Sequence, residues 1–262
     1  MNTKYAHIPQ ALKELDQWVC IYSDSKIPMR AVGREPASST SPETWSPFAT
    51  AVQAVADGHY DNIGFVFADN NLVGIDIDAG YDEDGFVTEV AADIIGACRS
   101  YTERSRSGRG LHVLLHGVLP FRGRNNLRGV EIYQSHRYFI MTGDVVVYDD
   151  LIANQDAIDY VVQKYFPDTT RKPGKPNTTR IYTPTWDKPR GNRIKIRPSY
   201  PRISIGARNI CLTSLAGTMH AHGYTDKQIY YELVAANREA CVPPLPTDEI
   251  RTIVRSVTRY TR

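Results

Sequence analysis

Three short segments carry charged side chains at positions where a hydrophobic core would have none. In chain order they are 74–78 (GIDID), 107–112 (SGRGLH) and 130–133 (VEIY), each in or beside a strand-like stretch. Side chains two residues apart on a strand point to the same face, so Asp76 and Asp78 share one face while their aliphatic neighbours enter the core. Burying like charges together is costly without a cation. Paired divalent cations are what phosphoryl and nucleotidyl transfer require.

Glu131 and His112 extend this candidate site. Glu131 alternates with Val130 and Ile132, and an acid in such a run needs a partner or a metal if it points inward. His112 enters a strand directly after a glycine-rich loop. A lone histidine there is more often a buried structural residue, but its place after the loop favours contact with a phosphate. Three carboxylates and a histidine therefore predict a two-metal site for phosphate chemistry.

The glycine-rich loop is a candidate phosphate-binding element. It consists of Ser107, Gly108, Arg109 and Gly110. Its backbone N–H groups and its guanidinium could hold a triphosphate. No Gly-Lys-Ser/Thr follows, so the loop is not a Walker A motif, and ATPase or helicase activity within this chain is not expected. Arg137 could neutralise the same triphosphate or pair with Glu131, and the sequence favours neither alternative.

An Asp-x-Asp pair by itself is weak evidence, because it also occurs in glycosyltransferases, nucleases and turns that follow strands. A calcium-binding EF-hand is excluded, since its sixth position would be Tyr81 rather than glycine and its twelfth Val87 rather than glutamate. The apolar residues that flank and separate the two aspartates favour a metal site at the end of a buried strand.

Hydrophobic patterns predict the elements that position these residues. Strands are expected over 17–22, 63–68, 72–77, 101–104, 111–115, 129–133 and 137–142. Helices are expected over 47–57 after a Ser46 cap, from Thr88 through Cys98, and over 152–164. This mixture predicts an α+β or α/β catalytic domain over residues 1–167.

The rest of the chain differs in composition. Residues 1–167 contain 14 Lys/Arg and 22 Asp/Glu, a balance of −8, whereas residues 168–262 contain 17 and 7, a balance of +10. Recurring prolines, with ten Lys/Arg against one Asp after residue 170, predict an extended basic linker over 168–205. An acidic part followed by a basic part indicates a metal-binding unit joined to a region that meets polyanions.

Residues 206–262 have the pattern of a small bundle of three helices, over 208–221, from Thr225 to about Ala240, and from a Thr247 cap onward. The apolar residues of the first helix are Ile210, Leu212, Leu215 and Met219, and Thr225 with Gln228 forms a capping box for the second. On the third helix, arginines recur every four residues and form either a solvated face or a phosphate-contacting face. The candidate DNA-binding residues of linker and bundle are Arg190, Arg193, Lys195, Arg251, Arg255 and Arg259.

Composition indicates a cytoplasmic protein without a membrane partner. The hydrophobic fraction of 42% and the charged fraction of 23% are ordinary for a globular protein. No apolar run approaches a membrane span, and the N-terminus lacks the layout of a signal peptide. Four scattered cysteines, with no Cys-x-x-Cys pair, favour neither a disulfide framework nor a zinc finger.

The order of the three motifs resembles the archaeo-eukaryotic primase superfamily, and most closely the primase-polymerase domains of phages, plasmids and other mobile elements. The resemblance includes the segment RYFIMTG at 137–143, which follows VEIY. Upstream segments such as IGFVF at 63–67 are also similar, and residues 208–262 resemble the helical primase C-terminal domain. The resemblance implies an RRM-like catalytic core with mixed or antiparallel sheets, followed by a small all-α bundle.

The resemblance also implies roles for the candidate residues. Asp76, Asp78 and Glu131 would be ligands of two divalent cations, Mg²⁺ or Mn²⁺, and His112 with the glycine loop would contact the phosphates of an NTP or dNTP. The implied function is primer synthesis on a single-stranded DNA template during replication of a mobile genetic element, with a replicative helicase as a candidate partner. The sequence departs from the simplest family pattern at two positions, with Glu131 in place of an aspartate and Gly110 in place of a serine.

Two other classes of function fit parts of the pattern. One is a metal-dependent nuclease or sugar-nucleotide transferase, which would also use an Asp-x-Asp pair. The other is a non-catalytic DNA-binding replication protein. The acidic trio argues against the second, because bare carboxylates would repel a phosphate backbone.

Overall fold

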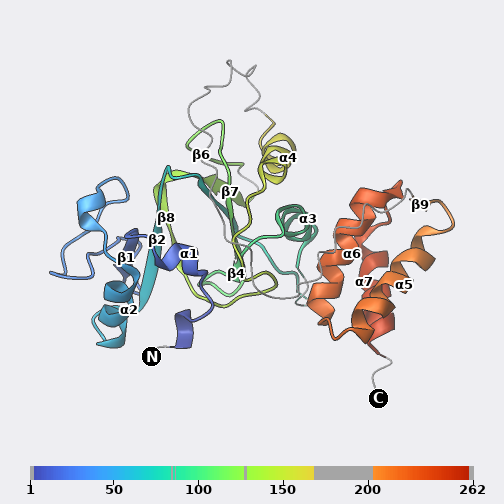
Figure 1. The fold of residues 1–262 in the computed structure, drawn as a ribbon, viewed down its shortest axis with the longest axis horizontal. Coiled ribbons are helices and arrows are strands. Elements are labelled where there is room, and N and C mark those ends of the chain that lie inside the picture. The colour runs from blue at the N-terminus through green and yellow to red at the C-terminus, as the bar shows by residue number, and fades with distance from the viewer. Residues whose placement is uncertain (1–2, 84, 86, 127–128, 168–202, 260–262) are drawn as a thin grey trace.

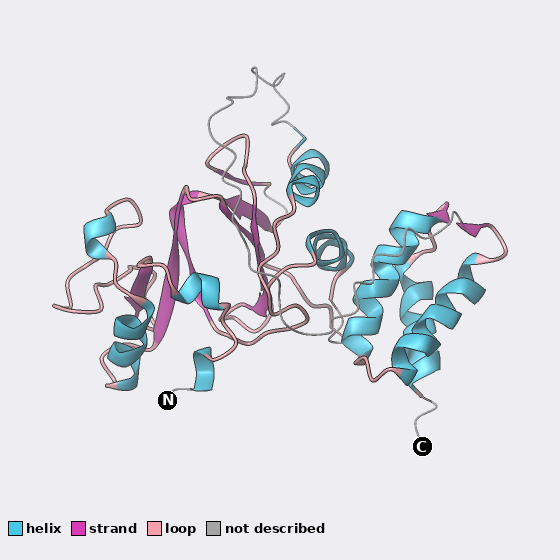
Figure 2. Cartoon of the chain, viewed as in Figure 1, coloured by secondary structure: helices cyan, strands magenta, loops and turns pink. Residues whose placement is uncertain are grey.

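Two antiparallel sheets form the centre of the molecule, and three helices follow them in the chain (Figure 1, Figure 2). This computed structural model describes residues 3–259 apart from 84, 86, 127–128 and 168–202. The predicted α+β class, with antiparallel sheets and a helical C-terminal region, is confirmed. The predicted linker lies almost entirely outside the described residues. In the part of the chain that is described, no helix is both long and apolar enough to cross a membrane.

The larger sheet has five strands in the order β4-β5-β3-β7-β6, and every neighbouring pair is antiparallel. Its strands are β3 (Leu72–Ile77), β4 (Thr102–Arg104), β5 (Leu111–His116), β6 (Gly123–Asn125) and β7 (Val130–Tyr133). On one face, Ile75 and Ile77 belong to a buried cluster that includes side chains of helices α3 (Glu89–Cys98) and α4 (Gln155–Tyr165). The aliphatic residues of β3 thus enter the core on one face, as their alternation predicts.

The smaller sheet packs on the opposite face of the larger one. Its strands β1 (Trp18–Ile21), β2 (Asn62–Ala68) and β8 (Ser135–Met141) pair in the order β1-β2-β8. The Phe67 and Phe139 rings join residues of β3 and β5 in a second buried cluster. Gly74 of β3 faces these rings, where a Cβ would overlap Phe67 and lie 2.6 Å from Phe139. Glycine therefore permits the close approach of the two sheets, and the face of β3 that bears Asp76 is turned toward the smaller sheet.

Short helical segments lie around the smaller sheet. They are the 3₁₀ helices η1 (Thr3–Tyr5) and η2 (Pro42–Thr44) and the helices α1 (Gln10–Lys13) and α2 (Phe48–Ala56). The predicted Ser46 cap of α2 is wrong, because Pro47 takes that position without a side-chain hydrogen bond. Ser46 instead exchanges two backbone hydrogen bonds with Trp18, at 3.1 and 2.8 Å. The helix predicted from residue 152 begins at Gln155, after an Asn154 cap.

The C-terminal helices α5 (Arg208–Ala221), α6 (Asp226–Ala240) and α7 (Thr247–Thr258) form the helical bundle, beside a short parallel pair of β9 (Ile203–Ser204) with β10 (Cys241–Val242). The Thr225–Gln228 capping box is present as predicted. Two predictions are wrong. Thr247 is the first residue of α7 rather than its cap, which is Pro246. Ile210 is 71% exposed, whereas the expected Leu212 and Met219 are buried, together with Ala216.

The bundle rests on helix α3, on the side of the larger sheet away from the smaller sheet (Figure 1). Gly96 of α3 lies against Ala235 of α6, and a Cβ at Gly96 would be 3.5 Å from the Ala235 Cβ. Four ion pairs also join the bundle to the catalytic part: Arg251 with Asp82 at 2.9 Å, Arg99 with Glu232 and with Glu239, both at 3.7 Å, and Arg238 with Asp93 at 3.8 Å. We call these side chains the bundle contact.

Candidate active site

A row of polar side chains crosses the larger sheet from edge to edge. In the strand register, Asp76 lies opposite His112 on β5 and opposite Glu131 on β7. His112 in turn lies opposite Glu103 on β4, and Glu131 lies opposite Asn125 on β6. Directly opposed residues of antiparallel strands put their side chains on the same face. The pairing therefore brings together Asp76, His112 and Glu131, which are far apart in the sequence, as the motif pattern predicts.

His112 is the buried centre of this row, with an exposed fraction of 5%. Its ring stacks on Phe139 of β8, with centroids 4.7 Å apart and an interplanar angle of 21°. Its Nε2 is 3.8 Å from Asp76 Oδ1, and its Nδ1 is 3.0 Å from Glu103 Oε1. Burial lowers the pKa of His112, but the hydrogen bond to Glu103 and the charges of Glu103 and Asp76 outweigh it, so the pKa is raised.

The pKa of Asp76 is also raised, but here burial and neighbouring like charges are the cause. Burial raises the pKa of its carboxyl group, His112 lowers it, and the negative charges of Asp78 and Glu131 raise it further. The net direction is upward. Asp78 and Glu131 are thus near enough to Asp76 for their charges to repel it. A bound cation would relieve this repulsion.

Asp78 follows the last residue of β3 and lies beside the glycine-rich loop 107–110. Its side chain is exposed, and its backbone N–H donates to the Gly129 carbonyl at 2.9 Å. Gly110 packs against the same turn, where a Cβ would be 2.9 Å from the Ile77 carbonyl oxygen. The Gly80 N–H donates to the Arg109 carbonyl at 2.8 Å. A glycine at position 110 therefore lets the loop lie directly beside Asp78.

Within the loop, Ser107 holds the backbone together. Its Oγ accepts the N–H groups of Arg109 and Gly110 at 3.3 and 3.4 Å. Gly108 has a φ of +76°, a conformation that favours glycine, and its N–H donates to the Ser105 carbonyl at 3.0 Å. The N–H groups of Gly108, Arg109 and Gly110 are thus already bonded, to Ser107 or to Ser105 just before the loop. These bonds to Ser107 are long, and a phosphate would have to compete with them.

Glu131 is bonded to two neighbours at the outer end of the row. Its Oε1 accepts from Asn125 Nδ2 at 2.6 Å, and its Oε2 pairs with Arg137 Nη2 at 3.4 Å. Arg137 also donates to the Tyr133 hydroxyl at 3.1 Å and lies over that ring. Of the two alternatives for Arg137, the structure contains the pairing with Glu131.

The carboxylates do not form a ready-made metal centre. Among the residues that the structure describes, no three His, Cys, Asp or Glu side chains are gathered in a way that could hold a metal ion. Both oxygens of Glu131 are bonded to other side chains, Asn125 and Arg137. The chemistry of the donors nevertheless fits hard divalent cations, which prefer carboxylate oxygens.

Sequence reasoning missed Glu103 and Asn125. Both stand in short polar strands, Thr102–Arg104 and Gly123–Asn125, where no hydrophobic alternation distinguishes one face from the other. Only the strand register aligns them with His112 and Glu131. A prediction of the pairing partners, rather than of the strands alone, would have found them.

Of the six predicted DNA-binding residues, the structure describes the three arginines of α7 and its C-terminal cap. Arg190, Arg193 and Lys195 lie outside the described residues. Arg251 pairs with Asp82 of the catalytic part and with Asp248 of its own helix. Arg255 and Arg259 have exposed side chains. The first arginine of the row on α7 is thus part of the bundle contact.

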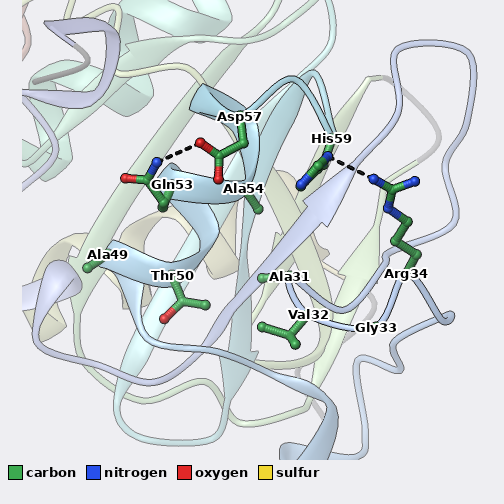
Figure 3. A pocket seen from close by; sticks show the side chains of 10 residues that line it. All are labelled: Ala31, Val32, Gly33, Arg34, Ala49, Thr50, Gln53, Ala54, Asp57 and His59. Carbon is green, nitrogen blue, oxygen red and sulfur yellow. Dashed lines mark hydrogen bonds between the residues drawn. The ribbon is translucent and has the colours of Figure 1, made fainter.

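Two surface cavities lie apart from the row. The larger, of about 660 Å³, is bounded by residues 31–34 and helix α2, with Arg34 donating to His59 at 2.9 Å at its rim (Figure 3). The smaller, of about 200 Å³, is bordered by Ser135 and His136 at the start of β8. None of the predicted site residues lines either cavity.

Comparisons with known proteins agree with the motifs. Residues 200–262 match the family described as Primase C terminal 1 (PriCT-1). A DNA primase-polymerase of Nitratiruptor phage NrS-1 is 34% identical over 145 residues, which are 52% of this chain and 20% of that protein. The match thus spans about a fifth of the length of this relative. As the motif order predicts, the chain is related to phage-type primase-polymerases and carries a primase C-terminal domain.

Proposed function

We propose that this chain synthesises primers on single-stranded DNA by nucleotidyl transfer, as part of the replication of a phage or another mobile element. The observation that carries the proposal is the row in which Asp76 lies between His112 and Glu131 on three adjacent strands. The relationship to a protein named as a DNA primase-polymerase supports the same class of reaction.

In this proposal, Asp76, Asp78 and Glu131 hold two divalent cations, Mg²⁺ or Mn²⁺. When bound, such ions activate a 3′-hydroxyl and neutralise charge on a triphosphate and its leaving group. Asp76 is the central ligand, because it alone stands between the other two carboxylates and His112. Glu131 must first give up its pairing with Arg137, and the guanidinium released in this way can then turn to a phosphate.

His112 and the glycine-rich loop bind the triphosphate of an incoming NTP or dNTP. The Nε2 atom of His112 is the ring nitrogen on the Asp76 side, so the Nε2–H of the protonated ring is the donor available to a phosphate oxygen. The loop residues 107–110 lie beside Asp78 and supply N–H groups and the Arg109 guanidinium. The protein thus contributes position and charge rather than a covalent intermediate.

A primase must also hold a template strand, and we assign this role to the basic C-terminal part of the chain. Residues 168–262 carry a balance of +10, which favours contact with phosphates. Arg190, Arg193 and Lys195 of the linker, with Arg255 and Arg259 of the bundle, are the proposed contacts. Arg251 is the weakest of the six predicted candidates, since its pairing with Asp82 already uses its charge. A replicative helicase is a proposed partner of the same replication reaction.

The proposal is tested by primer synthesis on circular single-stranded DNA, with labelled NTPs or dNTPs and Mg²⁺ or Mn²⁺. We expect the wild type to make primers, and Asp76→Asn to lose activity by about 10²–10³-fold or more, the effect of removing one group that stabilises a transition state. Asp149→Asn, which changes an exposed loop carboxylate, is the matched control and should retain full activity. A chelator should abolish synthesis by the wild type.

Each rival class gives a different result in the same assay. Cleavage of the template without extension would identify a nuclease. DNA binding that persists in a chelator, with no synthesis under either metal, would identify a non-catalytic DNA-binding protein. Equal activity of Asp76→Asn and wild type would overturn the assignment of the site.

A further inference from the structure

Glu103 is a fully buried carboxylate that the proposed chemistry has not yet used. Its exposed fraction is 0%, and it stands on β4, one strand away from His112 and two strands away from Asp76. A buried carboxylate is strongly destabilising unless it is hydrogen-bonded or paired. Specific hydrogen-bond partners must therefore compensate for the burial of Glu103.

The partners of Glu103 surround both of its oxygens. Oε2 accepts from the Tyr101 hydroxyl at 2.8 Å and from the Gly143 N–H at 2.8 Å. The Thr142 N–H points at both oxygens, at 3.2 and 3.1 Å. Oε1 is also 3.0 Å from His112 Nδ1. Backbone N–H groups can only donate, so the side chain that meets two of them must be an acceptor at both oxygens.

This acceptor character determines where His112 carries a proton. Because Oε1 accepts, the hydrogen bond with Nδ1 requires a proton on Nδ1. The opposite nitrogen, Nε2, then faces Asp76 at 3.8 Å. Carboxylate and phosphate oxygens only accept, so Nε2 must carry a second proton to bond either of them. Stacking on Phe139 restrains rotation of the ring, so the hydrogen bond and the stack together fix which nitrogen is turned toward the candidate site.

We propose that Glu103 is a positioning residue: it accepts from Nδ1–H of His112 and so aims an Nε2–H donor of the doubly protonated ring at the phosphates of the incoming nucleotide. The inference rests on the proposed function, because it deepens the role given there to His112. At metal sites, partners that orient a ligating histidine through its other nitrogen are a general feature, and their loss costs about 10–100-fold in metal affinity or activity. We expect an effect of the same size at His112.

The substitution Glu103→Gln tests this inference, because it keeps the shape and changes one acceptor into a donor. The two backbone N–H groups and the Tyr101 hydroxyl will keep the amide oxygen at the Oε2 position. The amide NH₂ then occupies the Oε1 position and meets Nδ1, which must become the acceptor. The ring then keeps only its Nε2 proton and loses the positive charge that attracts the phosphates. Tyr101→Phe is the matched control, since it removes one hydrogen bond to the same carboxylate without changing the contact with His112.

The first measurement is the ¹⁵N spectrum of the His112 side chain in the metal-free protein. Nδ1 should carry a proton in the wild type and in Tyr101→Phe, and should lose it in Glu103→Gln. A wild-type Nδ1 without a proton overturns the inference, and this measurement decides even if Glu103→Gln fails to fold. An unchanged Nδ1 proton in a folded Glu103→Gln protein overturns it as well.

The second measurement is the KM for ATP and for dATP in the Mn²⁺-dependent primer assay. Glu103→Gln should raise KM by about tenfold or more with a smaller change in kcat, and Tyr101→Phe should leave both near the wild-type values. An unchanged KM in Glu103→Gln overturns the role of Glu103 toward the nucleotide. Failure of the proposed function looks different, because the wild type would then make no primers while the ¹⁵N spectra still report the position of the proton.

Discussion

The candidate site and the bundle contact are both rich in charge, but they combine their charges in opposite ways. At the site, Asp76, Asp78 and Glu131 are carboxylates whose negative charges repel one another. At the bundle contact, each carboxylate faces an arginine, as in the pairs Asp82–Arg251 and Asp93–Arg238. Like charges placed together raise the free energy of the folded protein, whereas pairs of opposite sign lower it slightly or leave it unchanged.

The difference separates a site that needs a ligand from an interface that is already complete. The negative charge around Asp76 is only partly compensated by His112 and Arg137, so added cations would be bound favourably. The arginines of the bundle contact have their counter-charges within the molecule. A row of arginines on a helix is therefore evidence for nucleic-acid binding only after its partners inside the fold are known.

The apolar centre of the bundle contact offers the largest expected change in stability. Gly96 faces Ala235 with room for one methyl group, since a Cβ would lie at the ordinary contact distance of 3.5 Å. Gly96→Leu should force α3 and α6 apart and lower the free energy of unfolding by about 1–3 kcal/mol. Gly96→Ala fills the available space and removes the entropic cost of a helical glycine, so it should raise the free energy of unfolding by up to about 1 kcal/mol.

Urea unfolding of the two Gly96 variants measures both effects. If α3 and α6 form the contact, the two variants will move in opposite directions from the wild type. Equal stability of Gly96→Leu and wild type would mean that the bundle does not rest on α3 in solution. Chelated, metal-free protein should be used, so that the candidate site does not contribute through bound ions.

The sequence predicted the members of the site better than their arrangement. Strand alternation correctly separated Asp76 from Ile75 and Ile77, because one face of β3 packs on helices. It could not predict Glu103, whose strand has only three residues and no apolar pattern. It also could not assign Arg251 to Asp82, because a contact between residues so distant in sequence depends on how α7 and the segment between β3 and α3 are brought together. Local patterns predict elements, and only tertiary packing decides which charges meet.

His112 provides a pH-dependent test of its contacts with Glu103 and Asp76. Its pKa is raised above the ordinary value of 6.5 by Glu103 and Asp76, despite the opposing effect of burial. A group whose pKa is higher in the folded state binds its proton more tightly there. The resulting stabilisation is complete below about pH 6.5 and is lost as the pH rises through the raised pKa.

We therefore expect the wild type to lose stability over this pH range and His112→Gln to lose less. Unfolding by urea at a series of pH values, with a chelator present, measures the difference between the two proteins. Comparing the two cancels the titration of the other histidines, including His116, whose pKa is lowered by burial. Parallel curves for the two proteins would show that His112 is not held by its carboxylate partners.

The smallest predicted effects have opposite signs at the two regions and so test the comparison directly. Asp76→Asn removes a carboxylate whose pKa is raised, so at neutral pH the fold should become slightly more stable, since the charged form is disfavoured. Asp82→Asn breaks the ion pair with Arg251, in which the Asp82 side chain is 25% exposed and the Arg251 side chain 21%. This change should lower the free energy of unfolding by about 0.2–1 kcal/mol.

Thermal unfolding of these two variants, in a chelator and then in Mn²⁺, provides the measurement. In the chelator, Asp76→Asn should have a higher Tm than the wild type and Asp82→Asn a lower one. Mn²⁺ should raise the Tm of the wild type and of Asp82→Asn, because an ion that binds only the folded state stabilises it, and should have little effect on Asp76→Asn. Changes of the same sign in both variants would contradict the distinction between repelling and paired carboxylates. A Tm of Asp76→Asn that rises with Mn²⁺ as much as that of the wild type would mean that the ion binds elsewhere.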